Sequence, residues 1–247
     1  MSEGISLIPL FSGSTGNCTL VTGGDTKILI DAGVSSLKLC CALDSLGVDI
    51  QDISAIFITH EHDDHIKALP VLMKNHDLPV YMTESSYLAS PLKFSVNYID
   101  PGEKITVGDI EITPFPVSHD TAFCVGYTVR SGGHTAGIMT DTGYVTDEAV
   151  YCLSGCESVL IESNHDVGML QNGSYPYFLK KRILSERGHL SNDACAEFCS
   201  FLHEKGTESF ILAHLSRENN TPTKAIECAR LALGDGVDIV CAPESII

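Results

Sequence analysis

The chain of 247 residues is long enough for one large domain or two small ones, and its 44% hydrophobic content predicts a globular protein with a sizeable core. A formal net charge of −17 disfavours long-range attraction of a polyanion and argues against a broad, sequence-reading DNA-binding surface. Its ten cysteines come without an export signal or a membrane-length apolar run. We therefore expect reduced thiols, a cytoplasmic location and no membrane partner.

The first half of the chain is expected to be rich in β structure. Apolar or alternating runs separated by turn residues predict strands at residues 5–11, 18–22, 27–31, 55–59, 79–82, 104–107, 110–113, 122–129 and 135–140. Helices are expected at residues 35–46, 66–75 and 84–89. The glycine-rich segment 12–17 lacks the lysine of a phosphate-binding loop. It is either a plain hairpin turn or backbone that lies close to a site.

The second half alternates helices with strands. Helices are expected at residues 146–153, 176–185, 192–205 and 221–233, and strands at 158–161, 209–213 and 237–241. Cys195 and Cys199 are four residues apart, which fits the buried face of a helix. No repeat or linker divides the chain, so we expect one domain over residues 1–247. The predicted class is α/β, with two packed sheets covered by helices.

A hexapeptide at residues 60–65 concentrates metal-binding side chains. It follows an apolar strand and contains His60, His62, Asp64 and His65. Imidazole nitrogens and carboxylate oxygens are typical ligands of zinc and similar divalent ions. Because residues two apart on extended backbone point the same way, His60 and His62 can bind one ion. If a helix begins near Asp64, Asp64 and His65 turn toward a second point.

Other predicted strands also end on a histidine or an aspartate. These residues are Asp31, His119, Asp141 and His214. Strand ends on one side of a stack of sheets are where loop-borne sites collect, so the four positions support a common site. Asp31 has two interpretations: it caps the next helix, or it orients a metal-binding histidine through a hydrogen bond.

Residues 59–65, with Asp31, His119, Asp141 and His214 in the same order, resemble the motifs of the metallo-β-lactamase superfamily. The resemblance implies an αββα sandwich with two divalent metal ions, Zn or Mn, with Fe tolerated. One ion would be bound by His60, His62 and His119, and the other by Asp64, His65 and His214. Asp141 would bridge the ions, and Asp31 would hold the ligand loop. A hydroxide shared by the ions would attack the substrate, and Asp64 or Asp141 would accept or orient its proton.

Four further segments, at residues 12–18, 162–166, 188–192 and 213–220, resemble the YycJ/WalJ group. That group consists of bacterial phosphodiesterases related to ribonucleases Z and J and is associated with nuclease activity. The resemblance implies a phosphodiesterase or nuclease, acting on DNA or RNA from an end. The alternative enzyme is a small-molecule hydrolase for a thioester, a lactone or a cyclic nucleotide. A regulatory metal-binding module without turnover is the alternative outside enzymes.

His189 lies between Gly188 and a predicted helix, in a position suited to an exposed side chain. A phosphodiester leaving group departs as an alkoxide, so His189 is a candidate proton donor, held or tuned by Glu162 or His165. The other interpretation makes His189 a turn residue and His165 a loop histidine. The helix start at Ser191 and Asn192 can receive a phosphate through its free amides.

The acidic chain has one basic cluster, which consists of Lys180, Lys181 and Arg182. It is a candidate phosphate contact for a nucleic-acid substrate, and neighbouring Tyr175, Tyr177 and Phe178 would stack on bases. The ordinary alternative is a solvated helix face whose tyrosine and phenylalanine side chains belong to the core.

Overall fold

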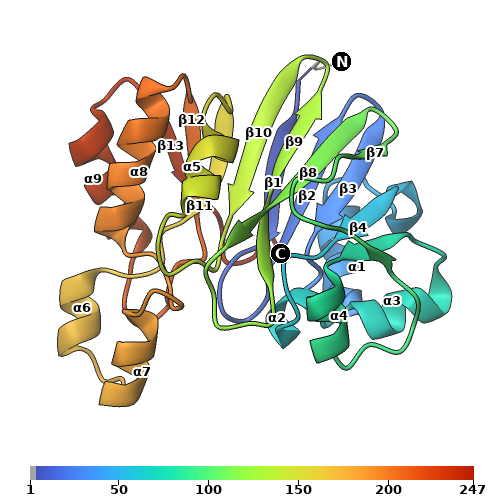
Figure 1. The fold of residues 1–247 in the computed structure, drawn as a ribbon, viewed down its shortest axis with the longest axis horizontal. Helices are drawn as coiled ribbons and strands as arrows, with labels where there is room; N and C mark the ends of the chain where they lie inside the picture. The colour runs from blue at the N-terminus through green and yellow to red at the C-terminus, as the bar shows by residue number, and fades with distance from the viewer. Residues whose placement is uncertain (1–3) are drawn as a thin grey trace.

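Two mixed β-sheets pack against each other, and helices cover their outer faces in the computed structural model of the chain (Figure 1). The structure describes residues 4–247, so the first three residues of the predicted domain lie outside the described residues. The architecture confirms the predicted αββα sandwich of two mixed sheets. In the described part of the chain, no helix combines the length and the apolar character that crossing a membrane requires. The ten cysteines are free thiols, as expected.

The first sheet has six strands in chain order: β1 (Ser6–Phe11), β2 (Cys18–Gly23), β3 (Thr26–Ile30), β4 (Ala55–Phe57), β5 (Val80–Met82) and β6 (Asn97–Tyr98). The first three pair antiparallel, and the pairs from β3 to β6 are parallel. The helices of this half are α1 (Ser36–Ser45), α2 (Asp63–Ile66), α3 (Leu69–Asn75) and α4 (Glu84–Ala89), with a short 3-10 helix at Ile50–Asp52.

The second sheet has seven strands, which also lie side by side in chain order: β7 (Ile105–Val107), β8 (Ile110–Val117), β9 (Cys124–Ser131), β10 (His134–Met139), β11 (Ser158–Glu162), β12 (Ser209–Ala213) and β13 (Asp238–Cys241). Strands β7 to β10 pair antiparallel, and β10 to β13 pair in parallel. The helices are α5 (Asp147–Leu153), α6 (Val167–Asn172), α7 (Tyr177–Ile183), α8 (Asn192–Glu204) and α9 (Pro222–Leu233).

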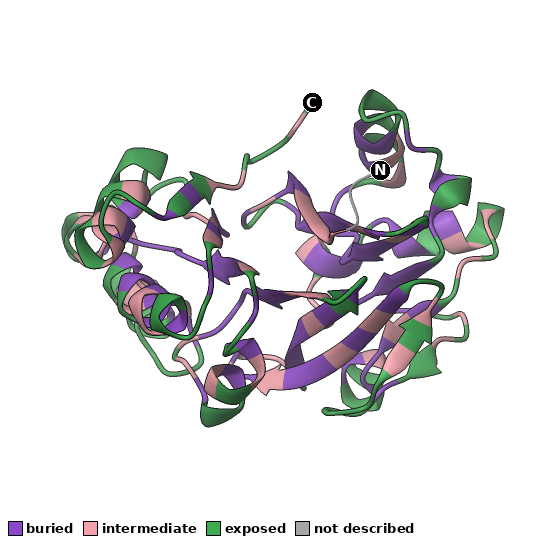
Figure 2. Ribbon diagram, turned by 90° about the horizontal axis from the view of Figure 1, so that it is seen from above, coloured by how far each residue is buried: buried purple, intermediate pink, exposed green. Residues whose placement is uncertain are grey.

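Three hydrophobic clusters hold the layers together. One lies between the sheets and includes Phe57 and Tyr127, and the other two join each sheet to its own helices. Cys195 and Cys199 belong to the cluster under α8, as their spacing predicted. Figure 2 shows buried residues along the strands and exposed residues on the outward faces of the helices. The strands are therefore fixed on both faces, which makes their ends a rigid frame for a site.

The predicted helix at residues 66–75 is two helices in the structure. α2 begins inside the hexapeptide, and α3 follows after a break at residues 67–68. Pro70 lies in the first turn of α3, and because proline has no backbone N–H it cannot bond to the carbonyl of Ile66. Asp64 and His65 are thus on α2, in agreement with a helix that starts near Asp64.

Helices α6 and α7 stand apart from the main layers, below α8 and α9 in Figure 1. α6 was not predicted; Asp166 caps it by accepting a hydrogen bond from the backbone N–H of Met169 at 2.7 Å. On α7, the side chains of Tyr177 and Phe178 are 77% and 74% exposed. The interpretation that placed these rings in the core was therefore wrong, because α7 has no second layer packed over this face.

Candidate metal centre

Parallel strands bring the site residues to one edge of the sandwich. β10, β11 and β12 pair in parallel, so their carboxyl ends lie side by side. Asp141 follows β10, Glu162 ends β11 and His214 follows β12. β3 and β4 are also parallel, and Asp31 and His60 follow them. Strand ends from both sheets therefore gather at a common edge.

Three of these residues have an unusual backbone conformation. The φ angles of Asp31, Asp141 and His214 are 62°, 56° and 56°, in the left-handed region that residues with a side chain seldom adopt. Such a conformation costs roughly 1–3 kcal/mol and persists where the surrounding structure fixes it. Here each sharp turn ends a strand and leaves a buried polar side chain at the shared edge.

His60, His62 and His119 form the first ligand group. Each offers a ring nitrogen within 4.8 Å of the others, and His60 Nε2 lies 3.0 Å from His62 Nδ1. The Nδ1–H of His119 donates to the carbonyl oxygen of Gly188 at 3.0 Å. Because that oxygen can only accept, Nε2 of His119 keeps its lone pair for a metal ion.

Asp64, His65 and His214 are the predicted second group, and each of the two histidines lies close to Asp141. His65 Nε2 lies 3.6 Å from Asp64 Oδ2 and 3.5 Å from Asp141 Oδ2. His214 Nδ1 is 3.2 Å from the same Asp141 oxygen. The other oxygen of Asp141, Oδ1, is 3.8 Å from His119 Nε2. One carboxylate thus faces both groups, one oxygen toward each.

Asp31 holds the second group from behind. Its Oδ2 accepts a hydrogen bond from His65 Nδ1–H at 2.8 Å, which leaves His65 Nε2 directed at the centre. Its Oδ1 accepts from the backbone N–H of Thr59 at 2.8 Å and so fixes the start of the hexapeptide. Ser35, not Asp31, caps α1. Of the two interpretations of Asp31, the geometry corresponds to the orienting carboxylate.

The two groups differ in their affinity for protons. Burial lowers the pKa of His65, but Asp31 and Asp141 outweigh it and raise that pKa to about 10. His214 is likewise buried, and Asp141 raises its pKa to about 9. Burial raises the pKa of Asp141, while His214 and His65 together bring it well below its usual value. Burial and His65 hold the pKa of His60 well below its usual value. A metal ion must therefore displace protons at the second group, whereas His60 is neutral and ready to bind.

The donor set fits divalent metal ions. Among the described residues, Asp141 Oδ2 and His214 Nδ1 are buried and lie 3.2 Å apart, but neither makes a hydrogen bond of good geometry, with the other or with a further group. Buried polar atoms without a partner are costly, and an ion at this point would satisfy both. Imidazole nitrogens combined with carboxylate oxygens suit zinc and also accept manganese or iron. The structure brings all seven predicted ligands together, and their individual roles remain predictions.

His189 lies next to both groups and is held by Glu162. Its ring centroid is 5.1 Å from that of His119 and 5.3 Å from that of His214. Its Nδ1 is 2.7 Å from Oε1 of Glu162, which is fully buried. The second oxygen of Glu162 accepts hydrogen bonds from two backbone amides, at 2.8 and 3.2 Å. Glu162 is thereby immobile, and it fixes His189 with Nε2 as the free ring nitrogen.

His165 is buried, but within residues 4–247 its ring nitrogens have no hydrogen-bond partner. Burial lowers its pKa to about 4, so the ring is neutral. Its backbone carbonyl accepts from the N–H of Asn192 at 2.9 Å. Of the two residues considered as the partner of His189, only Glu162 forms a hydrogen bond with it.

At the start of α8, the side chains of Ser191 and Asn192 make hydrogen bonds within the protein. Ser191 Oγ accepts from the backbone N–H of Ala194 at 3.2 Å and so caps the helix. Asn192 is 3% exposed, and its side chain accepts from Ser163 Oγ at 2.7 Å and pairs with Asn220. These side chains are already engaged inside the protein, and a phosphate contact through the backbone amides of Ser191 and Asn192 stays a prediction.

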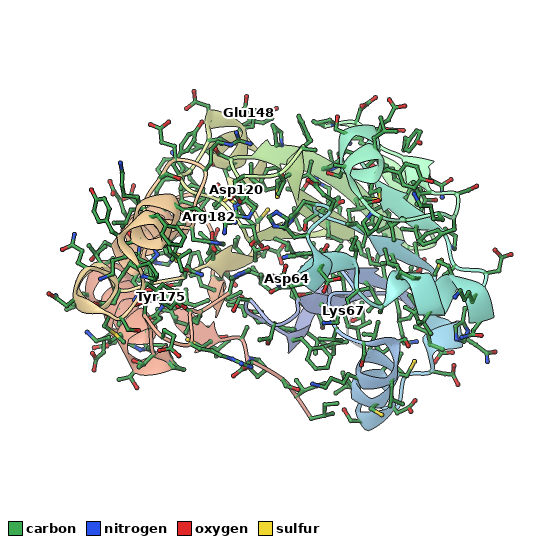
Figure 3. All side chains as sticks on the ribbon, turned by 90° about the horizontal axis from the view of Figure 1, so that it is seen from below. Asp64, Lys67, Asp120, Glu148, Tyr175 and Arg182 are labelled. Atoms are coloured by element: carbon green, nitrogen blue, oxygen red, sulfur yellow. The ribbon has the colours of Figure 1, made fainter. Side chains whose placement is uncertain are left out.

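The basic cluster lies on α7, beside the centre. Lys180 Nζ donates to two backbone carbonyls, at 2.9 and 2.7 Å, so its ammonium group is already bonded within the protein. Lys181 Nζ lies 5.8 Å from the ring centroid of Tyr177. Arg182 Nε donates to Asp120 Oδ2 at 2.5 Å, and the two residues are side by side in Figure 3. A cavity of about 160 Å³ opens between α7 and the centre; its lining includes Ser14, Tyr175, Arg182, His189 and His214.

Sequence reasoning missed two residues at the centre. Asp120 Oδ1 lies 3.4 Å from His119 Nε2. Asn17 Nδ2 lies 3.0 Å from His65 Nε2. Asp120 directly follows a predicted ligand, but an aspartate after a strand is common. Asn17 belongs to the glycine-rich segment for which proximity to a site was one of two interpretations, and the structure supports that one.

Comparison with known proteins agrees with this geometry. Residues 26–215 match the family described as the beta-lactamase superfamily domain. The chain is 39% identical to Exodeoxyribonuclease YycJ of Bacillus anthracis, over 88% of this chain and 84% of that protein. It is 37% identical to Exodeoxyribonuclease WalJ of Streptococcus pneumoniae, over 96% and 94% of the two chains. The crystal structure of the metallo-beta-lactamase fold protein YhfI from Bacillus subtilis shares the fold, with a TM-score of 0.75 over 98% of this chain and 97% of that one, at 18% identity. The chain therefore belongs to the metallo-β-lactamase superfamily and, within it, to the group of YycJ and WalJ.

Proposed function

We propose that this metal-dependent hydrolase is a two-metal exonuclease that cleaves phosphodiester bonds from a DNA end. The observation that carries the proposal is the Asp141 carboxylate, whose two oxygens face two separate ligand groups. Relatives that are 37% and 39% identical are named exodeoxyribonucleases, which supports DNA and an end-directed reaction.

In this proposal His60, His62 and His119 would hold one ion, Asp64, His65 and His214 would hold the other, and Asp141 would serve both. Bound divalent ions stabilise the charge that develops on phosphoryl oxygens and lower the pKa of water. Asp64 accepts or orients a proton from the attacking water. Zinc and manganese are the preferred ions on ligand chemistry, and iron is tolerated.

His189 is the proposed proton donor to the leaving oxygen. The hydrogen bond from Nδ1–H to Glu162 fixes the ring, so that Nε2 can carry a proton into the space next to His119 and His214. The His189 side chain is 19% exposed, which gives a substrate access to it. Donation of a proton to a departing alkoxide typically contributes about 10²–10⁴-fold to a rate.

Substrate contacts are proposed on α7. Arg182 lines the cavity beside the centre, where it pairs with Asp120, and Lys181 adds positive charge on the same helix, whereas Lys180 is bonded to backbone carbonyls. The exposed rings of Tyr177 and Phe178 offer faces on which bases can stack. A local patch of this kind suits an acidic chain, because its net charge of −17 gives no long-range attraction for DNA.

The test uses the purified protein loaded with Zn²⁺ or Mn²⁺. End-labelled single- and double-stranded DNA and RNA are offered beside bis-p-nitrophenyl phosphate and a thioester. We expect mononucleotide release from DNA ends and hydrolysis of the phosphodiester. Turnover of the thioester alone would refute the proposal. The control is the His60→Ala, His62→Ala double variant, which should lose both metal and activity.

A further inference from the structure

The loop between β1 and β2 lies against ligands from both halves of the chain. The backbone N–H of Asn17 donates to the carbonyl of Asp64 at 2.8 Å, and the Asn17 carbonyl accepts from the N–H of Gly33 at 2.8 Å. A side chain at Gly33 would collide with the Asp64 carbonyl, so the two segments are packed backbone to backbone. The loop is therefore part of the wall behind the second ligand group.

The Asn17 side chain is buried and has one orientation. It is 7% exposed, and its Oδ1 accepts from the backbone N–H of Gly13 at 3.0 Å. Since that oxygen must face the N–H donor, Nδ2 faces the metal centre. Nδ2 donates to Asp64 Oδ2 at 3.3 Å and lies 3.0 Å from His65 Nε2. A single amide thus touches two residues of the second group.

The same loop also fixes the third member of that group. Ser12 Oγ accepts from the backbone N–H of His214 at 2.8 Å. His214 has a φ of 56°, and Asn164 Nδ2 donates to its carbonyl at 2.8 Å. The strained turn at His214 is therefore held from both sides, by Ser12 on the N–H and by Asn164 on the carbonyl. Ser12 and Asn17 are five residues apart and join ligands that are 149 to 150 positions distant from each other in the sequence.

We propose that Asn17 and Ser12 are positioning residues for the second metal ion. Asn17 donates to Oδ2 of Asp64, the oxygen that faces His65 Nε2, and so holds the carboxylate beside that ring. Ser12 keeps the His214 ring turned toward Asp141. The inference rests on the two-ion site of the proposed function. It assigns to this loop a part of the affinity for the second ion. Partners that orient metal ligands typically contribute about 10–100-fold to metal affinity.

Metal binding tests the proposal without reference to activity. Apo-protein variants are titrated with Zn²⁺ in competition with a chromophoric chelator, and bound zinc is counted by mass spectrometry. Asn17→Ala and Ser12→Ala should each weaken the second ion by about 10–100-fold and leave the first ion unchanged. Asn75→Ala is the matched control, because its exposed side chain only bonds to a carbonyl within α3, at 3.1 Å. Retention of the first ion shows that a variant is folded.

A double-variant cycle separates positioning from general destabilisation. If Asn17 acts through Asp64, Asn17→Ala should cost little further affinity in a chain that already carries Asp64→Ala. Equal losses in both backgrounds, or wild-type affinity for both ions in Asn17→Ala and Ser12→Ala, would overturn the inference. If the wild-type protein binds two zinc ions but cleaves no nucleic acid, the proposed function is refuted instead. The two failures are therefore distinguishable.

Discussion

If His189 donates a proton to the leaving group, the cost of removing it depends on the substrate. His189→Ala leaves all seven proposed metal ligands in place and removes the ring held by Glu162 at 2.7 Å. A DNA alkoxide needs the proton, so its cleavage should slow by about 10²–10⁴-fold. A p-nitrophenolate leaves without one, so hydrolysis of bis-p-nitrophenyl phosphate should fall far less. The difference between the two losses measures proton donation.

Glu162→Gln gives a second estimate of the same effect. The amide keeps the size of the side chain but loses the charge of a hydrogen bond that is fully buried on the glutamate side. A hydrogen bond to a charged group contributes about 1.5–3 kcal/mol, so DNA cleavage should fall by roughly 10–100-fold. The assays are kcat for both substrates and metal content for each variant. Equal losses on the two substrates would refute proton donation. Loss of an ion from His189→Ala would make His189 a ligand, since its ring also lies within ligand distance of Asp141 and His214.

Three further predictions follow from charge, exposure and burial. The pKa values of His65 and His214 are raised to about 10 and about 9, so both rings carry a proton at about pH 7. Zn²⁺ binding should therefore release about two protons and weaken as the pH falls. Calorimetry in buffers of different ionisation enthalpy measures the number of protons released. Phe178→Ala should weaken single-stranded DNA binding by about 1–3 kcal/mol without changing bis-p-nitrophenyl phosphate hydrolysis, whereas Tyr151→Ala, which removes an 84% exposed ring on α5, should change neither; fluorescence anisotropy measures the binding. The pKa of His165 is lowered to about 4 from an unfolded value of about 6.5, so the unfolded chain binds a proton more readily, and the folded protein should lose about 2 kcal/mol of stability between about pH 7 and about pH 5. Urea unfolding of wild type and His165→Leu should show a flatter pH dependence in the variant.

The fold and the ligand positions were predictable because both depend on local patterns. Apolar alternation and turn residues indicate the strands, and the hexapeptide places four candidate ligands within six residues. The strand-end residues Asp141 and His214 could be grouped with it, because parallel strands present their carboxyl ends at one edge. These inferences need no knowledge of which side chains meet.

The contacts between distant segments were not predictable in the same way. Asn192 starts a helix, which predicts a role for its backbone amide, but nothing in the sequence indicates that its side chain pairs with Asn220 in the interior. An apolar residue such as Phe178 looks the same in the sequence whether it lies in a core or on a surface. Its exposure follows from the position of α7 outside the main layers. Asn17 lies in the segment 12–18 that resembles the YycJ/WalJ group, but its contact could not be predicted, because it depends on the place of Asp64 in space.

The segment after α7 connects the proposed substrate contacts on that helix to the metal centre. Arg182 ends the basic cluster, Gly188 supplies the carbonyl that orients His119, and His189 follows directly. A side chain at Gly188 would collide with the carbonyl of Ile183, so this turn is packed tightly against the end of α7. A displacement of α7 by a bound strand would therefore be transmitted to a metal-binding histidine and to the proposed proton donor together. Both halves of the chain supply residues of the centre, and this turn is a physical route by which the proposed substrate contact on α7 would be coupled to cleavage at the centre.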